Sequence, residues 1–221
     1  MIMLDACVSP KADHPSTGSG PASKSGRLFV SAAKRTFDIL TVLVAAPAAL
    51  LTIGVAAVVI FISSGRPVFF IQPRVGFRGK TFSMYKLRTM SNREPTCNAP
   101  TIVRDQRVTP VGAALRLYRI DELPQLLNIL RGDMSLIGPR PEQPSLVSFY
   151  RDRLAWFDTR HEVRPGITGL AQVECGYASN LEETRVKLSY DLQYVINWSF
   201  ALEARIFLKT VSTVIGAKGA R

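Results

Sequence analysis

One uncharged apolar run with a proline inside it constrains this chain more than any other feature. Residues 39–62 read ILTVLVAAPAALLTIGVAAVVIFI, which is 24 residues without an acidic or basic side chain, and Pro47 lies well inside the run. A helix of this length is sufficient to cross a bilayer hydrocarbon core of roughly 30 Å. The run therefore predicts that the remaining chain works at a membrane surface.

Basic residues flank this run on both sides, which bears on its topology. The flanking cations are Arg27, Lys34 and Arg35 before the run and Arg66, Arg74, Arg78, Lys80, Lys86, Arg88 and Arg93 after it. The positive-inside rule places such residues on the cytoplasmic side of a membrane. Because both flanks look cytoplasmic and Pro47 removes a helical hydrogen bond, we expect a re-entrant helix–break–helix over residues 27–63. A single kinked spanning helix is the alternative, since spanning helices tolerate proline.

The chain is strongly basic, with 28 Lys and Arg against 17 Asp and Glu and a formal charge of +11. This charge favours polyanionic partners such as anionic lipid headgroups, a phosphorylated substrate or nucleic acid. Nucleic acid is disfavoured by the apolar run and by the lack of interleaved aromatic and basic residues. Two histidines and three scattered cysteines show no metal-ligand spacing and no disulfide framework, which favours a reducing compartment.

The overall pattern predicts an α+β, mostly helical fold. Residues 1–26 are rich in Ser, Gly and Pro and predict a disordered tail, which leaves 64–221 as one cytoplasmic domain. Apolar and turn patterns predict a β-hairpin over 68–85, helices over 111–118, 123–131, 147–161, 181–197 and 199–215, and a short strand over 170–173. The last helix combines apolar residues with cations, so we expect it to lie along the membrane interface.

Asp121 and Glu122 are the strongest candidates for chemistry, although an acidic pair is also typical of a solvated helix start. Adjacent side chains diverge by about 100° in a helix and face opposite ways in a strand, which disfavours one shared acid–base role. Two separate roles are more natural. One carboxylate attacks, and the other holds a hard cation such as Mg²⁺ beside substrate phosphates. The arginines suited to bidentate phosphate binding are Arg116, Arg140 and Arg164.

Six sequence blocks occur in the order typical of one enzyme family. The blocks are KRTFDIL (34–40), GRPVFFIQPRVGFRGKTFSMYKLRTM (65–90), DQRVTPVGAALR (105–116), DELPQLLNILRGDMSLIGPRPE (121–142), RPGITGLAQV (164–173) and YDLQYVINWSF (190–200). With them the chain resembles the bacterial sugar transferases, the monotopic polyprenyl-phosphate phosphoglycosyl transferases, over roughly 185 residues. Residues 164–188 are most similar to the exopolysaccharide-type branch of the family.

This resemblance implies a membrane-bound enzyme at the cytoplasmic face of the bacterial inner membrane. The family transfers hexose-1-phosphate from a UDP-hexose to undecaprenyl phosphate and releases UMP, which initiates exopolysaccharide or other glycan synthesis. The aspartate matching Asp121 is the family's proposed nucleophile, and it gives a covalent phosphosugar intermediate. The glutamate matching Glu122 is tied to Mg²⁺, Arg116 and Arg140 match family arginines, and the family's membrane segment is re-entrant and broken at a proline matching Pro47. Glucose and galactose are the expected sugars, with N-acetylated and deoxy sugars as alternatives.

The chain departs from the family pattern at two places. Ala46 precedes Pro47 where many relatives have Ser, and Glu174-Cys175-Gly176-Tyr177 follows the Ala-Gln-Val segment where many have Asn-Gly-Arg. Any nucleotide contact of that arginine therefore does not transfer to this chain. A non-catalytic membrane-bound scaffold of a polysaccharide assembly complex is the alternative to the enzyme.

Overall fold

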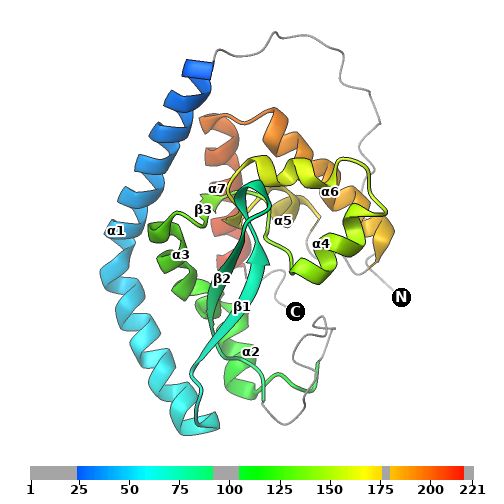
Figure 1. The fold of residues 1–221 in the computed structure, drawn as a ribbon. Coiled ribbons are helices and arrows are strands. Elements are labelled where there is room, and N and C mark those ends of the chain that lie inside the picture. The colour runs from blue at the N-terminus through cyan, green and yellow to red at the C-terminus, as the bar shows by residue number, and fades with distance from the viewer. Residues whose placement is uncertain (1–23, 92–104, 176–179, 217–221) are drawn as a thin grey trace.

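The computed structural model describes residues 24–91, 105–175 and 180–216 (Figure 1). A long helix, α1 (Lys24–Ser64), lies along one side of a mostly helical domain that also contains a β-hairpin. Residues Ala32–Ser64 of α1 are long and apolar enough to cross a membrane. The predicted tail falls largely on residues 1–23, which lie outside the described residues, and α1 begins at Lys24 rather than near residue 27.

Helix α1 continues through Pro47 without an interruption of its helical backbone. The expected break at this residue is therefore not present, although Figure 1 shows the helix changing direction near its middle. Proline removes one backbone donor and bends a helix, and helices in apolar surroundings tolerate this loss. Pro47 is exposed in the structure.

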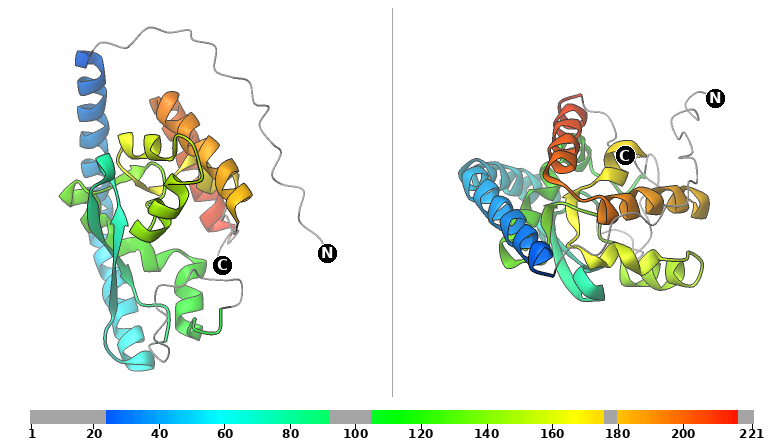
Figure 2. Two further views of the ribbon diagram at one scale, coloured as in Figure 1. Left: turned by 45° about the vertical axis from the view of Figure 1, so that its right-hand side comes forward. Right: turned by 90° about the horizontal axis from the view of Figure 1, so that it is seen from above.

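The two faces of α1 have different surroundings. The buried residues recur at helical spacing on one face and are Asp38, Val42, Ala49, Ala56 and Ile60. The other face exposes large apolar side chains, including Leu43, Val44, Leu50, Leu51, Val58 and Ile62. Figure 2, seen from above, shows α1 at the edge of the molecule with the whole domain on one side of it. The domain therefore covers one face of α1 along most of its length, and the apolar outer face is left without a protein partner among the described residues.

The predicted hairpin is confirmed. Strand β1 (Phe69–Val75) pairs antiparallel with β2 (Thr81–Leu87), with Phe69 opposite Leu87 and Val75 opposite Thr81. The connection is a 3-10 turn, η1 (Phe77–Gly79), in which Gly79 takes a positive φ of 73°. A glycine at this position permits the tight reversal without a steric cost.

The rest of the domain is built from short helices and a second small sheet. Its elements are α2 (Pro110–Leu117), η2 (Ile120–Gln125), α3 (Leu126–Arg131), β3 (Ser135–Ile137), α4 (Pro144–Arg151), η3 (Phe157–Glu162), β4 (Gly166–Thr168), α5 (Leu170–Glu174), α6 (Leu181–Ile196) and α7 (Phe200–Ile215). Strands β3 and β4 pair in parallel. The helices expected over 111–118, 181–197 and 199–215 are confirmed as α2, α6 and α7. Their caps include Thr109 before α2 and Asn180 before α6.

Two expected elements differ from the structure. The helix expected over 147–161 ends at Arg151, and the chain turns through Trp156, whose φ is 63°, before η3 begins. Val147, Leu154 and Phe157 nevertheless pack into one core cluster with Val75, so the apolar spacing reflected burial rather than a continuous helix. The strand expected over 170–173 is the helix α5, and the neighbouring strand is β4, two residues earlier.

A close backbone approach holds the second sheet together. Gly138 N donates to Thr168 O at 2.9 Å, and Gly166 N donates to Pro139 O at 3.0 Å. A Cβ on Gly166 would lie only 2.1 Å from Gly138 N, so a side chain there has no room. These contacts fix the start of the segment 138–142, which carries Arg140.

Candidate active site

The two candidate carboxylates lie inside the 3-10 turn η2, between α2 and α3. The preceding residue, Arg119, takes a left-handed conformation with a φ of 58°. This reversal brings η2 against β2. Asp121 and Glu122 are both buried, with 7% and 6% of their surface exposed. The helix expected from residue 123 begins as α3 at Leu126, and Gly132 ends it with a φ of 89°.

Glu122 is held by three cations: Lys86 of β2, Arg119 just before η2, and Arg140 of the segment 138–142. Its Oε1 accepts from Lys86 Nζ at 3.0 Å and from Arg140 Nη2 at 2.6 Å, and its Oε2 lies 3.7 Å from Arg119 Nη1. Burial alone raises the pKa of Glu122, but the charges of Arg140 and Lys86 outweigh it and hold this pKa far below its ordinary value. Glu122 is therefore a carboxylate at any physiological pH.

Asp121 has different surroundings from its neighbour. Among the described residues, no side chain or backbone group donates a hydrogen bond to its carboxyl group. Burial raises the pKa of Asp121, the charge of Lys86 lowers it, and the adjacent Glu122 raises it again. The two carboxyls therefore differ in their contacts: Glu122 forms ion pairs, whereas Asp121 accepts no hydrogen bond from the described residues.

The structure brings two of the three candidate arginines to this carboxyl pair. Arg140 contacts Glu122 directly. Arg116, in the last turn of α2, lies close enough to Asp121 for its charge to lower the pKa of that carboxyl. Arg116 Nε donates to Thr89 Oγ1 at 2.8 Å, which holds the guanidinium at the end of β2.

Arg164 lies in other surroundings. Its Nε donates to Gly132 O at 2.9 Å, and its guanidinium lies over the ring of Phe77 with 5.6 Å to the centroid. Its charge acts on Arg35 of α1. None of its contacts among the described residues reaches Asp121 or Glu122, so its expected role in phosphate binding stays a prediction without support from this geometry.

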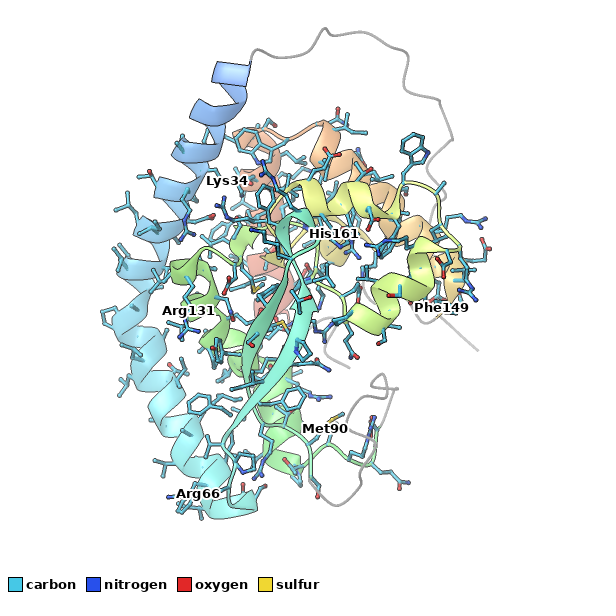
Figure 3. The ribbon with its side chains drawn as sticks, viewed as in Figure 1. Lys34, Arg66, Met90, Arg131, Phe149 and His161 are labelled. Atoms are coloured by element: carbon cyan, nitrogen blue, oxygen red, sulfur yellow. The ribbon has the colours of Figure 1, made fainter. Side chains whose placement is uncertain are left out.

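Sequence reasoning counted Lys86 only as one cation of the basic stretch 66–93. In the structure Lys86, Arg74 and Arg88 turn into the protein, while Arg66, Arg78 and Lys80 are exposed. Figure 3 shows Arg66 at the far end of α1 from Lys34. Residue 93 lies outside the described residues, as do Gly176 and Tyr177. A sequence signal distinguishes Lys86 from the exposed cations of this stretch. Lys86 directly follows the predicted hairpin, two residues before Arg88 and therefore on the same face of an extended chain, and it lies inside one of the sequence blocks that resemble the family.

The donor chemistry of the site fits a metal ion that enters with substrate phosphates. The described residues contain no group of three or more His, Cys, Asp or Glu side chains that could hold an ion alone. Mg²⁺ commonly binds through one or two carboxylates together with phosphate oxygens and water. Within residues 24–91, 105–175 and 180–216, the oxygens of Asp121 accept no hydrogen bond, and Glu122 would have to exchange part of its contact with Lys86 or Arg140 to become a ligand.

This arrangement suits reactions of a phosphorylated substrate. A buried carboxylate without hydrogen bonds is a competent nucleophile when it is ionised. The surrounding Lys86, Arg116 and Arg140 place positive charge where phosphate oxygens would lie, and charge preorganised in a buried site stabilises a developing anion.

Most of this chain is similar in sequence to known proteins. The model of the bacterial sugar transferase family matches residues 29–217. The UDP-N-acetylgalactosamine-undecaprenyl-phosphate N-acetylgalactosaminephosphotransferase of Aeromonas hydrophila is 43% identical over 189 residues, which cover 85% of this chain and 45% of that protein. The UDP-glucose:undecaprenyl-phosphate glucose-1-phosphate transferase of Caulobacter vibrioides is 40% identical over 204 residues, 88% of this chain and 74% of that protein.

A third relative is similar in length to this chain. The uncharacterized sugar transferase EpsL of Bacillus subtilis is 40% identical over 186 residues, which cover 84% of this chain and 89% of that protein. The chain thus spans less than half of the Aeromonas protein but most of the Caulobacter and Bacillus proteins. These matches confirm the resemblance carried by the six sequence blocks, and the chain belongs to the bacterial sugar transferase family.

Proposed function

We propose that this protein transfers hexose-1-phosphate from a UDP-sugar to undecaprenyl phosphate, releasing UMP, as the initiating step of exopolysaccharide or other glycan synthesis. The observation that carries the proposal is the contrast between the two adjacent carboxyls. Asp121 is buried beside three cations without a hydrogen-bond donor among the described residues, while Glu122 neutralises Lys86 and Arg140. Relatives named as undecaprenyl-phosphate sugar phosphotransferases support the substrate class.

The reaction proceeds in two displacements. The ionised Asp121 carboxylate attacks the β-phosphorus of the UDP-sugar, and the bond between this phosphorus and the bridging oxygen breaks, so UMP leaves with that oxygen. An oxygen of undecaprenyl phosphate then attacks the phosphorus of the hexose phosphate on Asp121. This step forms the lipid-linked diphosphate and restores the carboxylate. Arg140, Lys86 and Arg116 neutralise the phosphate oxygens in both steps.

Glu122 has a positioning role in this scheme, because it orients Lys86 and Arg140. We also propose that Mg²⁺ binds with the substrate diphosphate, with Glu122 as a protein ligand. The ion would supply charge neutralisation of the departing UMP.

The packing of α1 supports a topology in which both of its ends lie on the same side of the membrane, with the helix bending near its middle rather than breaking (Figure 1). Contacts with the domain extend from Lys34, which pairs with Glu203 of α7, to Ile60, a distance of about 39 Å along a helix with a 1.5 Å rise. A helix that crossed a hydrocarbon core of about 30 Å would take the charged domain into the lipid with it. We therefore propose that both ends of α1 lie at the cytoplasmic face of the inner membrane and that its apolar outer face contacts lipid.

A screen for UMP release tests the catalytic proposal. Purified protein in nanodiscs is incubated with undecaprenyl phosphate, Mg²⁺ and a panel of UDP-sugars, and quenched samples are analysed by intact mass. We expect UMP release with at least one UDP-hexose and an added hexose phosphate on the peptide that contains Asp121. The Asp121→Asn variant should give neither. An inactive wild-type protein would favour the scaffold alternative, and full turnover by the variant would exclude Asp121 as the nucleophile.

A cysteine-accessibility experiment tests the topology. Cys7, Cys97 and Cys175 are replaced by Ser, and single cysteines are placed at Ser25 and at Arg66. In intact cells we expect a membrane-impermeant thiol reagent to label neither position until the inner membrane is permeabilised. Periplasmic labelling at residue 25 alone would show a spanning helix.

A further inference from the structure

Behind Arg140 lies a buried cluster of charged residues that the proposed reaction does not use. The cluster consists of Arg74 on β1, Glu142, Arg160 on η3, and Lys187 and Asp191 on α6. Arg160 and Asp191 are each almost fully buried. Replacing buried ion pairs by apolar residues is often neutral or stabilising, so this cluster is a candidate for a role beyond stability.

Arg160 connects this cluster to the active site through a single residue. Its Nη2 donates to Arg140 O at 2.7 Å and lies 2.8 Å from Asp191 Oδ2. The side chain of the same Arg140 donates to Glu122 Oε1 at 2.6 Å. Arg140 is therefore held at its backbone from η3 and at its guanidinium from η2.

The neighbours of Arg140 leave little freedom to its backbone. Pro139 and Pro141 restrict φ on both sides. Arg74 Nη1 donates to Pro141 O at 3.0 Å, and Val75 N donates to Glu142 O at 2.9 Å. Two arginines therefore donate to carbonyls of this segment, and Arg160 is the one that binds the carbonyl of Arg140 itself.

We propose that Arg160, held in place by Asp191, is a positioning residue that sets Arg140 against Glu122 and the substrate phosphate. This inference rests on the proposed function, because it assigns Arg160 an effect on turnover exerted only through Arg140. Both contacts come from Nη2 of Arg160, while Nη1 lies 4.0 Å from Glu142 Oε1. A lysine at position 160 keeps the charge, but its nitrogen lies one bond nearer the backbone than Nη2 and has no second nitrogen beside it, so we expect the contact with Arg140 O to be lost.

A double-mutant cycle on kcat for UMP release tests the positioning role. We expect Arg160→Lys to lower kcat at least tenfold, and Asp191→Asn to lower it less because Arg160 keeps a neutral acceptor. In an Arg140→Ala background, Arg160→Lys should change kcat less than twofold, since the group through which it acts is gone. An equal loss of kcat in both backgrounds would overturn the proposal and leave Arg160 a structural role only.

A second measurement does not depend on turnover. Hydrogen exchange at the amides of Val75 and Gly166, which donate to Glu142 O and Pro139 O, should become faster in Arg160→Lys, while exchange in α7 stays unchanged. Glu203→Gln is the control, because it removes a buried charge paired with Lys34 and does not contact the segment 138–142. It should speed exchange near α7 and leave kcat within twofold. Unchanged exchange at residues 75 and 166 in Arg160→Lys would overturn this inference, whereas a wild-type protein that releases no UMP would overturn the proposed function.

Discussion

Lys86 Nζ lies 3.0 Å from Glu122 Oε1, and the charge of the same lysine lowers the pKa of the adjacent Asp121. One strand residue thus acts on both candidate carboxyls. Glu122 acts on Asp121 in the opposite direction, because its negative charge raises the pKa of that carboxyl. The ionisation of the nucleophile therefore depends on the balance between Lys86 and Glu122.

Lys86→Met should shift the acid limb of the pH profile of kcat/KM to higher pH. Asp121 must be ionised to attack, so activity rises as pH rises through its pKa, and loss of the lysine charge raises this pKa further. UMP release measured from pH 4 to 8 checks the shift. Lys86→Arg is the control, because it keeps the charge and should leave the acid limb near its wild-type pH. An acid limb at the wild-type pH in Lys86→Met would show that the charge of Lys86 does not lower the pKa of Asp121.

Glu122→Gln should move the same limb in the opposite direction. Removing the negative charge lowers the pKa of Asp121, so the residual activity should begin at lower pH than in the wild type. The maximal rate should fall by about 10²-fold or more, because Lys86 and Arg140 lose the group that orients them. The dependence of the remaining rate on Mg²⁺ concentration should weaken as well. A limb shifted to higher pH would be inconsistent with the electrostatic account.

The parts of the fold that sequence predicted well are those with strong local signals. Glycines at 76 and 79 between two apolar strands marked the hairpin, and the pattern Ser-Asn-Leu-Glu at residues 179–182, which fits a capping box, marked the start of α6. The break between α4 and η3 was missed because it leaves the apolar residues in one cluster. The strand prediction over 170–173 is wrong because a segment of four residues, three of them apolar, fits either structure.

The active site was predictable only where adjacent residues carried it. Asp121 and Glu122 stand out as a pair, and their divergence follows from backbone geometry alone. Lys86 precedes Glu122 by 36 residues and Arg140 follows it by 18, so their meeting depends on how β2 and the segment 138–142 pack around η2. Arg164 illustrates the opposite case. It lies in a sequence motif of the family, but in the structure it binds Gly132 O and lies over the ring of Phe77 instead of reaching the two carboxyls.

Glu142→Gln should lower stability at neutral pH and converge with the wild type in acid. Burial raises the pKa of Glu142, but Lys187, Arg160 and Arg74 outweigh it and lower this pKa from 4.5 to about 2. A depressed pKa contributes stability above the unfolded value, and this contribution is lost as pH falls from about 4.5 towards 2. The shift corresponds to about 3 kcal/mol. Unfolding in detergent at pH 7 and pH 3 measures the difference, and an equal destabilisation at both pH values would contradict it.

Arg88→Met should loosen the end of α1. Arg88 Nη2 donates to Ser64 O at 2.6 Å and Gly65 O at 2.7 Å, which pairs carbonyls that the helix itself leaves free. Losing these bonds in a buried position should cost about 1–3 kcal/mol of unfolding free energy. Thermal unfolding checks this value, and Lys80→Met, at an exposed cation, should change it by less than about 0.5 kcal/mol. Equal effects of the two variants would argue against a specific cap.

Gly166→Ala tests whether the second sheet positions the site. The added Cβ would lie 2.1 Å from Gly138 N and 2.4 Å from Thr168 O, so the backbone of residues 138–139 must move away from β4. Overpacking of this kind costs about 1–3 kcal/mol, and the movement should carry Arg140 away from Glu122. We expect a lower melting temperature and a fall in kcat of tenfold or more. Gly54→Ala is the matched control, because a Cβ at this exposed position in α1 meets nothing within 4 Å and alanine favours a helix. Gly54→Ala should leave kcat unchanged. A Gly166→Ala protein with wild-type kcat would show that β4 does not determine the position of Arg140.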